Sequence, residues 1–327
     1  MNNIPGRKIL ARISKTGVGG QLFSLLLILI LFVVGTGGEY ISIRNIQTIL
    51  GLAGIPIIIA MGLHLVIVLG AMDLSVEGII AICGVLTGLL LRNKITPFDI
   101  GFWIVPIVMA AGAMIGWVNG ALNTKLRMPS FISTLGMSWA FFGVAILISG
   151  GKSIHILDDR FQRIINGEII GIPNILLIAV VLLVIFQLLQ TRTKFGRHVY
   201  AIGGDEQLAK QAGVKVDRVK IISFMIAGLF YGLSALLLVT RLSSAAARIG
   251  NNTLFPAMTA VAVGGVALTG GIGGAKNAAL GALIITALNN GLVMMKVIPY
   301  AQDAVNGLVL IVAVALTIDR KKLGFIK

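Results

Sequence analysis

Side chains that could perform catalysis are few in this sequence and lie far apart. The three histidines are His64, His155 and His198, and the single cysteine is Cys83. One cysteine excludes a disulfide or a thiolate metal site within the chain. The zinc-protease, dithiol redox and serine-hydrolase motifs are all absent from the sequence. We therefore expect no catalytic site, no metal site and no bound cofactor, and we do not expect an enzyme.

The run Gly151-Lys152-Ser153 looks like the end of a P-loop, whose glycine-rich backbone cradles the phosphates of a nucleotide. The motif requires another glycine at the position that Ile146 occupies, and the preceding residues form an apolar run. We therefore reject this match. If ATP drives a process in which this protein takes part, a separate chain must hydrolyse it.

Asp73 is the most costly charged residue to place, because it lies between two apolar runs in the stretch LGAMDLSVEG. A carboxylate at membrane depth is unfavourable unless it is paired or hydrated. In one interpretation Asp73 is the N-cap of the next helix, and Glu77 lies in the first turn, where acids favour the helix dipole. In the other, Asp73 lies on a transport pathway and couples to a proton or an ion.

Amide and aromatic side chains are candidates for lining a solute pathway. An amide both donates and accepts hydrogen bonds, as recognition of a neutral hydroxylated solute requires. Hydrogen bonding between helices is the alternative role of each amide. The pathway candidates, besides Asp73, are Asn119, Asn123, Phe255, Asn289 and Asn290.

These groups must be positioned by a membrane-embedded scaffold. The chain is 57 % hydrophobic and 12 % charged, whereas a soluble domain has roughly 25 % charged residues. Apolar runs of about 20 residues, each enough to cross a bilayer, recur along it. We predict an all-α polytopic membrane protein with one transmembrane domain over residues 1–327. Its ten predicted spans cover residues 21–34, 46–69, 76–91, 101–122, 131–148, 175–189, 221–239, 254–268, 278–295 and 304–318.

The distribution of charge predicts how these helices are oriented. Basic residues are retained on the cytoplasmic side of a membrane. With both termini in the cytoplasm, the cytoplasmic segments hold twice as many of the 27 lysines and arginines as the outer segments do. The same bias accounts for the net charge of +15. We therefore expect no nucleic-acid partner.

Small residues predict close packing between helices. Gly112, Gly116 and Gly120 share one helix face, and Gly228 and Gly232 share another. Faces of this kind let two backbones approach closely inside a membrane. We therefore expect each of these faces to pack against a neighbouring helix.

A glycine-rich stretch and a sequence echo predict further features of the architecture. Residues 263–274, VGGVALTGGIGG, form helix poorly and predict a short, broken or re-entrant eighth span. Segments 119–131 and 287–301 each place Ala-Leu-Asn at the end of one span and proline at the start of the next. Five spans separate them, which predicts a 5+5 inverted repeat of the kind found in transporters.

The longest polar stretch covers residues 192–220 and lies between two apolar runs. Within it, two glycines precede a pair of acids, and another glycine follows a run rich in alanine, a pattern typical of a short helix. Its apolar side chains form a small knob. The stretch is either a docking site for a cytoplasmic partner or a solvated loop. The candidate docking residues are Gly203, Gly204, Asp205, Glu206, Leu208, Ala209, Ala212 and Gly213.

Several stretches resemble, in the same order, the ribose-type permeases of ABC importers. YAIGGDEQLAKQAGVKV resembles the cytoplasmic coupling segment of that family, and LGAMDLSVEG resembles its Gly-x-Asp-Leu-Ser-Val-Gly motif. The runs RLSSA, AVAVGGVALTGGIGG and LNNGL also match. The resemblance covers nearly the whole chain. It implies a type II-like importer permease in the bacterial cytoplasmic (inner) membrane, which forms a pathway for a sugar or sugar-like solute.

The resemblance also implies partners. Two ATP-binding cassette subunits would dock on the coupling segment, and a second copy of the permease or a paralogous permease would complete the pathway. A periplasmic or lipid-anchored sugar-binding protein would deliver the solute, and membrane lipid would surround the helices. ATP binding would press on the coupling helices, so that the permease alternates access without chemistry of its own.

Two departures from the family pattern concern the solute. The chain has Glu77 where the family has glycine after Asp-Leu-Ser-Val. Residues 253–258 read Thr-Leu-Phe-Pro-Ala-Met where the family has Glu-Leu-Asp-Ala-Ile-Ala, so two acids are missing. These changes predict a different sugar, or a partner permease that supplies the missing groups. The alternative function is an ion-coupled secondary transporter of a small polar solute.

Overall fold

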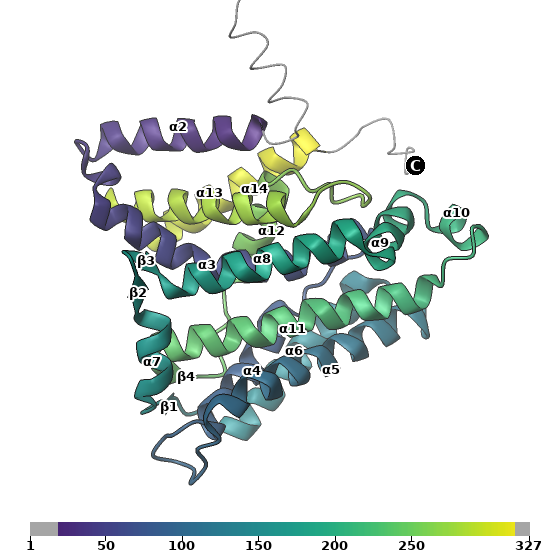
Figure 1. Cartoon of the computed structure of the whole chain (residues 1–327), viewed down its shortest axis with the longest axis horizontal. Coiled ribbons are helices and arrows are strands. Elements are labelled where there is room, and N and C mark those ends of the chain that lie inside the picture. Colours follow the sequence, from purple (N-terminus) through teal and green to yellow (C-terminus); the bar gives the residue numbers. More distant parts are fainter. Residues whose placement is uncertain (1–18, 318–327) are drawn as a thin grey trace, which may run out of the picture.

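The computed structural model describes residues 19–317, which are almost entirely helical (Figure 1). The helices are α2 (Gly19–Gly35), η1 (Glu39–Ile41), α3 (Ile43–Val68), α4 (Val76–Leu90), η2 (Gly101–Trp103), α5 (Ile104–Thr124), α6 (Ser130–Ser149), α7 (Asp159–Asn166), α8 (Asn174–Arg192), α9 (Lys194–Gly204), α10 (Glu206–Gln211), α11 (Val216–Leu242), α12 (Leu254–Val263), α13 (Ala275–Met294) and α14 (Pro299–Thr317). The short strands are β1 (Ile154–His155), β2 (Glu168–Ile169), β3 (Ile172–Pro173) and β4 (Ser244–Ala245).

A helix occupies every predicted span, and the all-α polytopic fold is confirmed. Within residues 19–317, six helices are long and apolar enough to cross a membrane, namely α3, α5 with the η2 turn before it, α6, α8, α11 and α13. Helices α2, α4, α12 and α14 are apolar but shorter. The count of ten crossings therefore stays a prediction. Residues 1–18 and 318–327, whose basic side chains support the predicted cytoplasmic termini, lie outside the described part of the chain.

The two predicted glycine faces pack against each other, because α5 lies along α11. A Cβ atom on Gly112 would lie 2.1 Å from the carbonyl oxygen of Gly228, and one on Gly116 would lie 2.1 Å from that of Phe224. These distances are far below van der Waals contact, so only glycine permits this approach. Both motifs therefore belong to a single interface, and the prediction of close packing is confirmed.

The helix contacts follow the predicted 5+5 repeat. Helix α3 packs on α13 as α11 packs on α5, and the short helices α4 and α12 pack on α6 and α14. In each half a helix of 26 or 27 residues is followed by a non-helical stretch and a short helix. The two halves thus share one order of elements. With five predicted spans between equivalent helices, the two halves are expected to cross in opposite directions.

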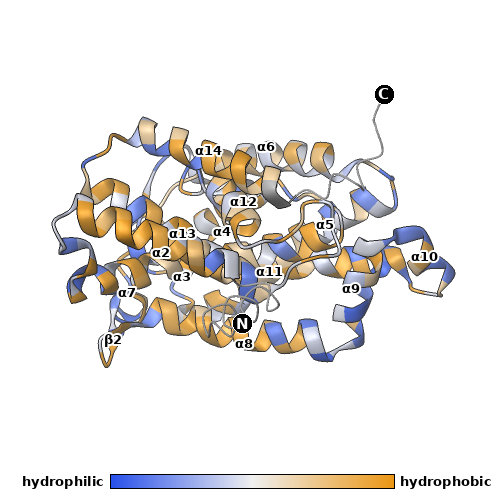
Figure 2. Cartoon of the chain, turned by 90° about the horizontal axis from the view of Figure 1, so that it is seen from above, coloured by the Kyte–Doolittle hydropathy of each residue, from blue (hydrophilic) through white to orange (hydrophobic). Residues whose placement is uncertain are grey.

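Polar segments gather at both ends of the long helices. Helices α9 and α10 lie at one end of the bundle, and α7 with the four short strands lies at the other (Figure 1). Strand β1 pairs antiparallel with β4, and β2 pairs antiparallel with β3. The ribbon is hydrophobic along α2, α8 and α13 and hydrophilic at α10 (Figure 2). The candidate docking segment and the predicted outer loops therefore lie at opposite ends.

The variant Gly112→Ala is expected to destabilise the protein, because its Cβ atom would overlap the Gly228 carbonyl. Gly136 in α6 has no atom within 4 Å of the corresponding position. The matched control Gly136→Ala should therefore gain up to about 1 kcal/mol of helix propensity. Thermal unfolding of the detergent-purified protein should show a lowered midpoint for Gly112→Ala alone. Equal midpoints in the two variants would contradict the packing.

Candidate solute pathway and coupling site

Two short helices meet at their N-termini inside the bundle. Helices α4 and α12 have 15 and 10 residues, which at 1.5 Å per residue is roughly 22 and 15 Å, less than the roughly 30 Å of a bilayer core. Glu77 lies in the first turn of α4. Its Oε1 atom accepts hydrogen bonds of 3.1 Å from the backbone N–H groups of Thr253 and Leu254, where α12 begins. One carboxylate therefore lies between the positive ends of two helix dipoles.

Asp73 lies in the break between α3 and α4 and is 1 % exposed. Its Oδ1 atom accepts hydrogen bonds from the backbone N–H of Ser75 at 2.9 Å and from its hydroxyl at 2.5 Å. Asn119 donates to the same hydroxyl at 2.7 Å, and the hydroxyl of Tyr231 lies beside the carboxylate. The N-cap of α4 is Ser75, so the prediction that Asp73 itself is the N-cap is wrong. Asp73 instead closes the turn that leads into the helix.

The predicted pathway amides make contacts within the bundle. Asn119 is buried on Ser75, and Asn123 donates to the carbonyl of Met128 between α5 and α6. Asn289 accepts a 3.0 Å hydrogen bond from Asn306. Asn290 is buried in α13. Asn119 and Asn289 therefore bond to neighbouring elements, which is the alternative role that the sequence left open. The pathway role of the four amides stays a prediction.

Phe255 differs from the amides, since it is 65 % exposed and borders a cavity of about 600 Å³. The cavity lies where α4 and α12 meet and also touches α6. Its wall combines aromatic rings with polar side chains. It is lined by Met72, Leu74, Glu77, Gly78, Phe131, Leu135, Ser138, Trp139, Phe142, Arg248, Asn251, Asn252, Leu254, Phe255 and Met258.

Sequence reasoning missed several residues of this cavity. Asn251 and Asn252 directly precede α12 and were not selected. The sequence carried a signal for them, because both asparagines stand just before the short span that is predicted to be broken. Polar residues at the start of a broken helix can face a binding site. Arg248 lies over the ring of Phe142, 5.9 Å from its centroid. An aromatic wall with a few convergent polar groups is the usual composition of a small-molecule site.

A short helix is confirmed where the candidate docking segment predicts one, as α10, with a second helix, α9, directly before it. The coupling role of α10 stays a prediction. Asp205 is its N-cap, and Oδ1 accepts a 2.9 Å hydrogen bond from the backbone N–H of Leu208. The leucine side chain is 61 % exposed, whereas Ala209 is 5 % exposed and faces inward. The expected knob is therefore smaller than the sequence predicts. Gly203 and Gly204, which the sequence predicts to precede the short helix, form the last turn of α9.

Gly203 is the point at which this helix pair contacts the rest of the bundle. A Cβ atom on it would lie 1.8 Å from the carbonyl oxygen of Val68, at the end of α3, and 2.6 Å from the backbone nitrogen of Gly271. That nitrogen donates a 2.8 Å hydrogen bond to the same Val68 carbonyl. The end of α3, the end of α9 and the loop between α12 and α13 thus meet at one junction, which only glycine can occupy.

Two side chains hold the start of α13 at this junction. The Oε1 atom of Gln190 accepts a 3.0 Å hydrogen bond from the backbone N–H of Ala275, and its amide nitrogen lies 3.1 Å from Nε2 of His64. Tyr200 of α9 donates a 2.6 Å hydrogen bond to the carbonyl of Gly273. His64 therefore has the interhelical role that a lone membrane histidine usually has.

A family model described as "Branched-chain amino acid transport system / permease component" matches residues 45–314. The chain belongs to this permease family. The ribose import permease protein of Bacillus subtilis is 36 % identical over 95 % of this chain and 96 % of its own length. The L-arabinose transport system permease protein of Escherichia coli is 32 % identical over 92 % and 89 %, and the autoinducer 2 import system permease protein of Photorhabdus luminescens is 30 % identical over 84 % and 81 %. No solved structure matches significantly.

An ion-pair cluster ties together the end of the permease opposite to α10. Arg160 at the start of α7 pairs with Asp158 at 2.6 Å and with Asp99, before α5, at 2.5 Å. The hydrogen bond from Arg160 lowers the pKa of Asp158 below its ordinary value. The cluster therefore joins the loop between α4 and α5 to the segment between α6 and α8.

Removing the Glu77 carboxylate should loosen the start of α12. A hydrogen bond to a charged group contributes about 1.5–3 kcal/mol, so Glu77→Ala should lower the unfolding free energy by about 2 kcal/mol. Glu77→Gln keeps one acceptor and should lose about half of that. Thermal unfolding checks this order, with Glu39→Ala as an exposed acidic control. A midpoint for Glu77→Ala equal to that of the control would refute the capping role.

The Asp158 pair should make stability sensitive to acid. Because the folded-state pKa is lowered, the stabilisation is present above the ordinary aspartate pKa of about 3.9. It is lost as the pH falls through the lower folded-state value. The unfolding midpoint should therefore decrease as the pH drops below about 4, and Asp158→Asn should show a smaller decrease. Asp159→Asn is the neighbouring control and should behave like the unmodified permease.

Proposed function

We propose that this permease is the transmembrane subunit of an ABC importer and forms the pathway for a sugar or sugar-like solute. The observation that carries the proposal is the cavity where α4 and α12 meet, in which aromatic rings lie beside amides and a serine hydroxyl. A sugar presents apolar C–H faces to rings and hydroxyls to amides. The names of relatives that import ribose and L-arabinose favour this solute class.

The family description names branched-chain amino acids, but the cavity suits such a solute less well. An amino acid needs an acid and a base for its two charged ends. Glu77 already accepts two backbone hydrogen bonds, and Arg248 is placed over Phe142. The polar groups left for a solute are mainly neutral, as a sugar requires.

The position of Glu77 offers an explanation for the two departures from the sugar-permease pattern. The family pattern has an acid at position 253, where this chain has threonine, and glycine at position 77. In the structure the Glu77 carboxylate reaches the backbone N–H of Thr253. We infer that Glu77 supplies from α4 one of the acids that the start of α12 has lost. The replacement keeps an acid at the start of α12, where it caps the backbone.

The proposed assembly has two ATP-binding cassette subunits beneath α10 and a second permease, identical or paralogous, beside this one. A periplasmic or lipid-anchored binding protein delivers the sugar at the end that carries α7. The permease has no P-loop, so ATP hydrolysis belongs to the cassette subunits. It lies in the bacterial cytoplasmic membrane with both termini in the cytoplasm, as one transmembrane domain over residues 1–327 with the coupling segment at 192–220.

Coupling would proceed from α10 through the glycine junction. The exposed Leu208 contacts the ATPase, and a push on α10 moves α9. Because Gly203 touches both Val68 and Gly271, that movement reaches the end of α3 and the loop after α12 together. The end of α3 leads into the break before α4, and the loop follows α12, whose first residues line the cavity. ATP binding would therefore change the cavity from two sides at once.

Leu208→Glu should abolish the stimulation of ATPase activity by sugar-loaded binding protein, because it places a charge on the docking surface. The permease should still fold, since this side chain is 61 % exposed. Leu208→Met is the volume-conserving control and should retain stimulation. Ala209→Glu is a poorer test, because Ala209 is buried and its replacement would disturb the fold. Normal stimulation of the assembled Leu208→Glu complex would exclude this contact.

Proteoliposomes distinguish the ABC importer from the alternative, an ion-coupled secondary transporter. The buried carboxylate of Asp73 is the observation that favours the alternative. We expect labelled ribose to enter only when the cassette subunits, ATP and binding protein are present, and Asp73→Asn to retain partial uptake. Uptake by the permease alone under a proton or sodium gradient would overturn the proposal, especially if Asp73→Asn abolished it.

A further inference from the structure

One stripe of α3 lines two neighbouring cavities in the half of the molecule that carries α7. The outer cavity is about 430 Å³ and the inner one about 300 Å³. Their α3 residues recur with helical spacing and form a single face. At 1.5 Å per residue this face is roughly 22 Å long. The outer cavity is bordered by Arg44, Gln47, Thr48 and Gly51, and the inner cavity by Leu52, Ile55, Pro56 and Ile59.

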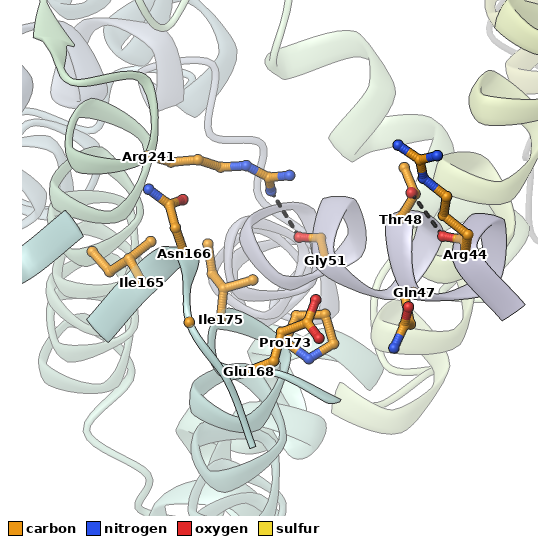
Figure 3. Close-up of a pocket in the computed structure, with 11 residues that line it drawn as sticks. Arg44, Gln47, Thr48, Gly51, Ile165, Asn166, Glu168, Pro173, Ile175 and Arg241 are labelled. Atoms are coloured by element: carbon orange, nitrogen blue, oxygen red, sulfur yellow. Dashed lines mark hydrogen bonds between the residues drawn. The ribbon is translucent and has the colours of Figure 1, made fainter. Parts of the chain in front are cut away.

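The outer cavity is polar and carries two cations and one anion. Arg241 reaches across from α11 and donates a 2.7 Å hydrogen bond to the carbonyl of Gly51, while Arg44 lies at the other side (Figure 3). Glu168, from the segment after α7, also borders the cavity. A guanidinium has five N–H donors in a planar fork. Arg241 therefore has donors left for a ligand beyond its contact with Gly51.

The inner cavity is lined mainly by apolar side chains and lies next to the outer one. Arg241 borders both, so the two spaces meet at its side chain. The side chain of Leu52 on α3 is 39 % exposed and borders this cavity. The facing walls are aliphatic, with Leu238 from α11 and Ile285 from α13. The polar side chains on its wall are Arg241, Asn252, Thr253, Thr286 and Asn289. The long apolar stripe of α3 suits a hydrocarbon chain, which needs no hydrogen-bond partner along its length.

We infer that these neighbouring cavities bind one membrane phospholipid. Its phosphate lies against Arg241 at the mouth, because guanidinium and phosphate form strong charge-assisted hydrogen bonds. One acyl chain follows the α3 stripe into the inner cavity. Glu168 faces the headgroup and accepts a hydrogen bond from it, so an ethanolamine headgroup binds more tightly than choline, whose nitrogen has no N–H to donate.

The bound chain would also contact the pathway. Pro256 and Ala260 of α12 border the inner cavity opposite α3. An acyl chain between α12 and α3 would fill the space among α12, α3 and α13 and so hold the short helix α12 in place. The inference rests on the two cavities alone and holds whether or not the solute is a sugar.

Native mass spectrometry of the full-length permease in detergent tests the site. Phosphatidylethanolamine, phosphatidylcholine with the same acyl chains, and inorganic phosphate are added separately to delipidated protein. The variants are Arg241→Gln at the mouth, Leu52→Trp, which fills the inner cavity while keeping both arginines, and Glu168→Gln. Arg163→Gln is the matched control, since Arg163 is an exposed arginine of α7 that does not line the cavity.

The permease and Arg163→Gln should each retain one phosphatidylethanolamine molecule. Arg241→Gln and Leu52→Trp should each bind it at least about tenfold more weakly, while Glu168→Gln should lose the preference over phosphatidylcholine. Unchanged retention by Leu52→Trp would overturn the inference, because the chain would then lie elsewhere. Occupancy by inorganic phosphate at the same affinity as the lipid would also overturn it, since the site would recognise an anion alone.

Discussion

The requirement that backbone polar groups in a bilayer find partners within the protein governs this structure. Two helices break inside the bundle, and each break leaves backbone N–H groups without helical partners. Glu77 accepts from the N–H groups of Thr253 and Leu254, and Asp73 accepts from that of Ser75. These acids allow two half-helices to begin in the interior. The cavity with the composition of a sugar site lies where they begin, so the same contacts support both stability and the proposed pathway.

The same requirement shapes the other end of the bundle. The Val68 carbonyl at the end of α3 accepts a hydrogen bond from Gly271, and Gln190 accepts from Ala275 at the start of α13. Gly203 packs against this junction so closely that no side chain fits. The proposed coupling segment therefore rests directly on the end of α3, which leads into the break before α4, and on the loop that follows α12. The short polar helix α10 can act on the proposed pathway because direct backbone contacts connect α9 to the end of α3 and to the loop after α12.

Sequence reasoning succeeded where the physics is local. The N-cap role suits Asp205 because an aspartate before a short helix satisfies the N–H groups that follow it. The glycine faces of α5 and α11 were readable because helical spacing alone places Gly112 and Gly116 on one side. The amides were harder to assign. Whether Asn119 faces a pathway or a neighbouring helix depends on how its helix is rotated, and spacing within one helix does not determine that rotation.

The sequence by itself determined the membrane-embedded helical class, the approximate helix bounds, the short helix of the candidate docking segment and the permease resemblance. Hydrophobic length, capping and turn residues act over a few neighbouring positions. Tertiary structure alone decided that Glu77 caps α12, that Phe255 and Trp139 share a cavity, and that Arg241 borders two neighbouring cavities. These pairs are far apart in the chain. They meet only because glycine-lined helices pack closely and two spans break inside the bundle, where unpaired N–H groups require a partner from elsewhere.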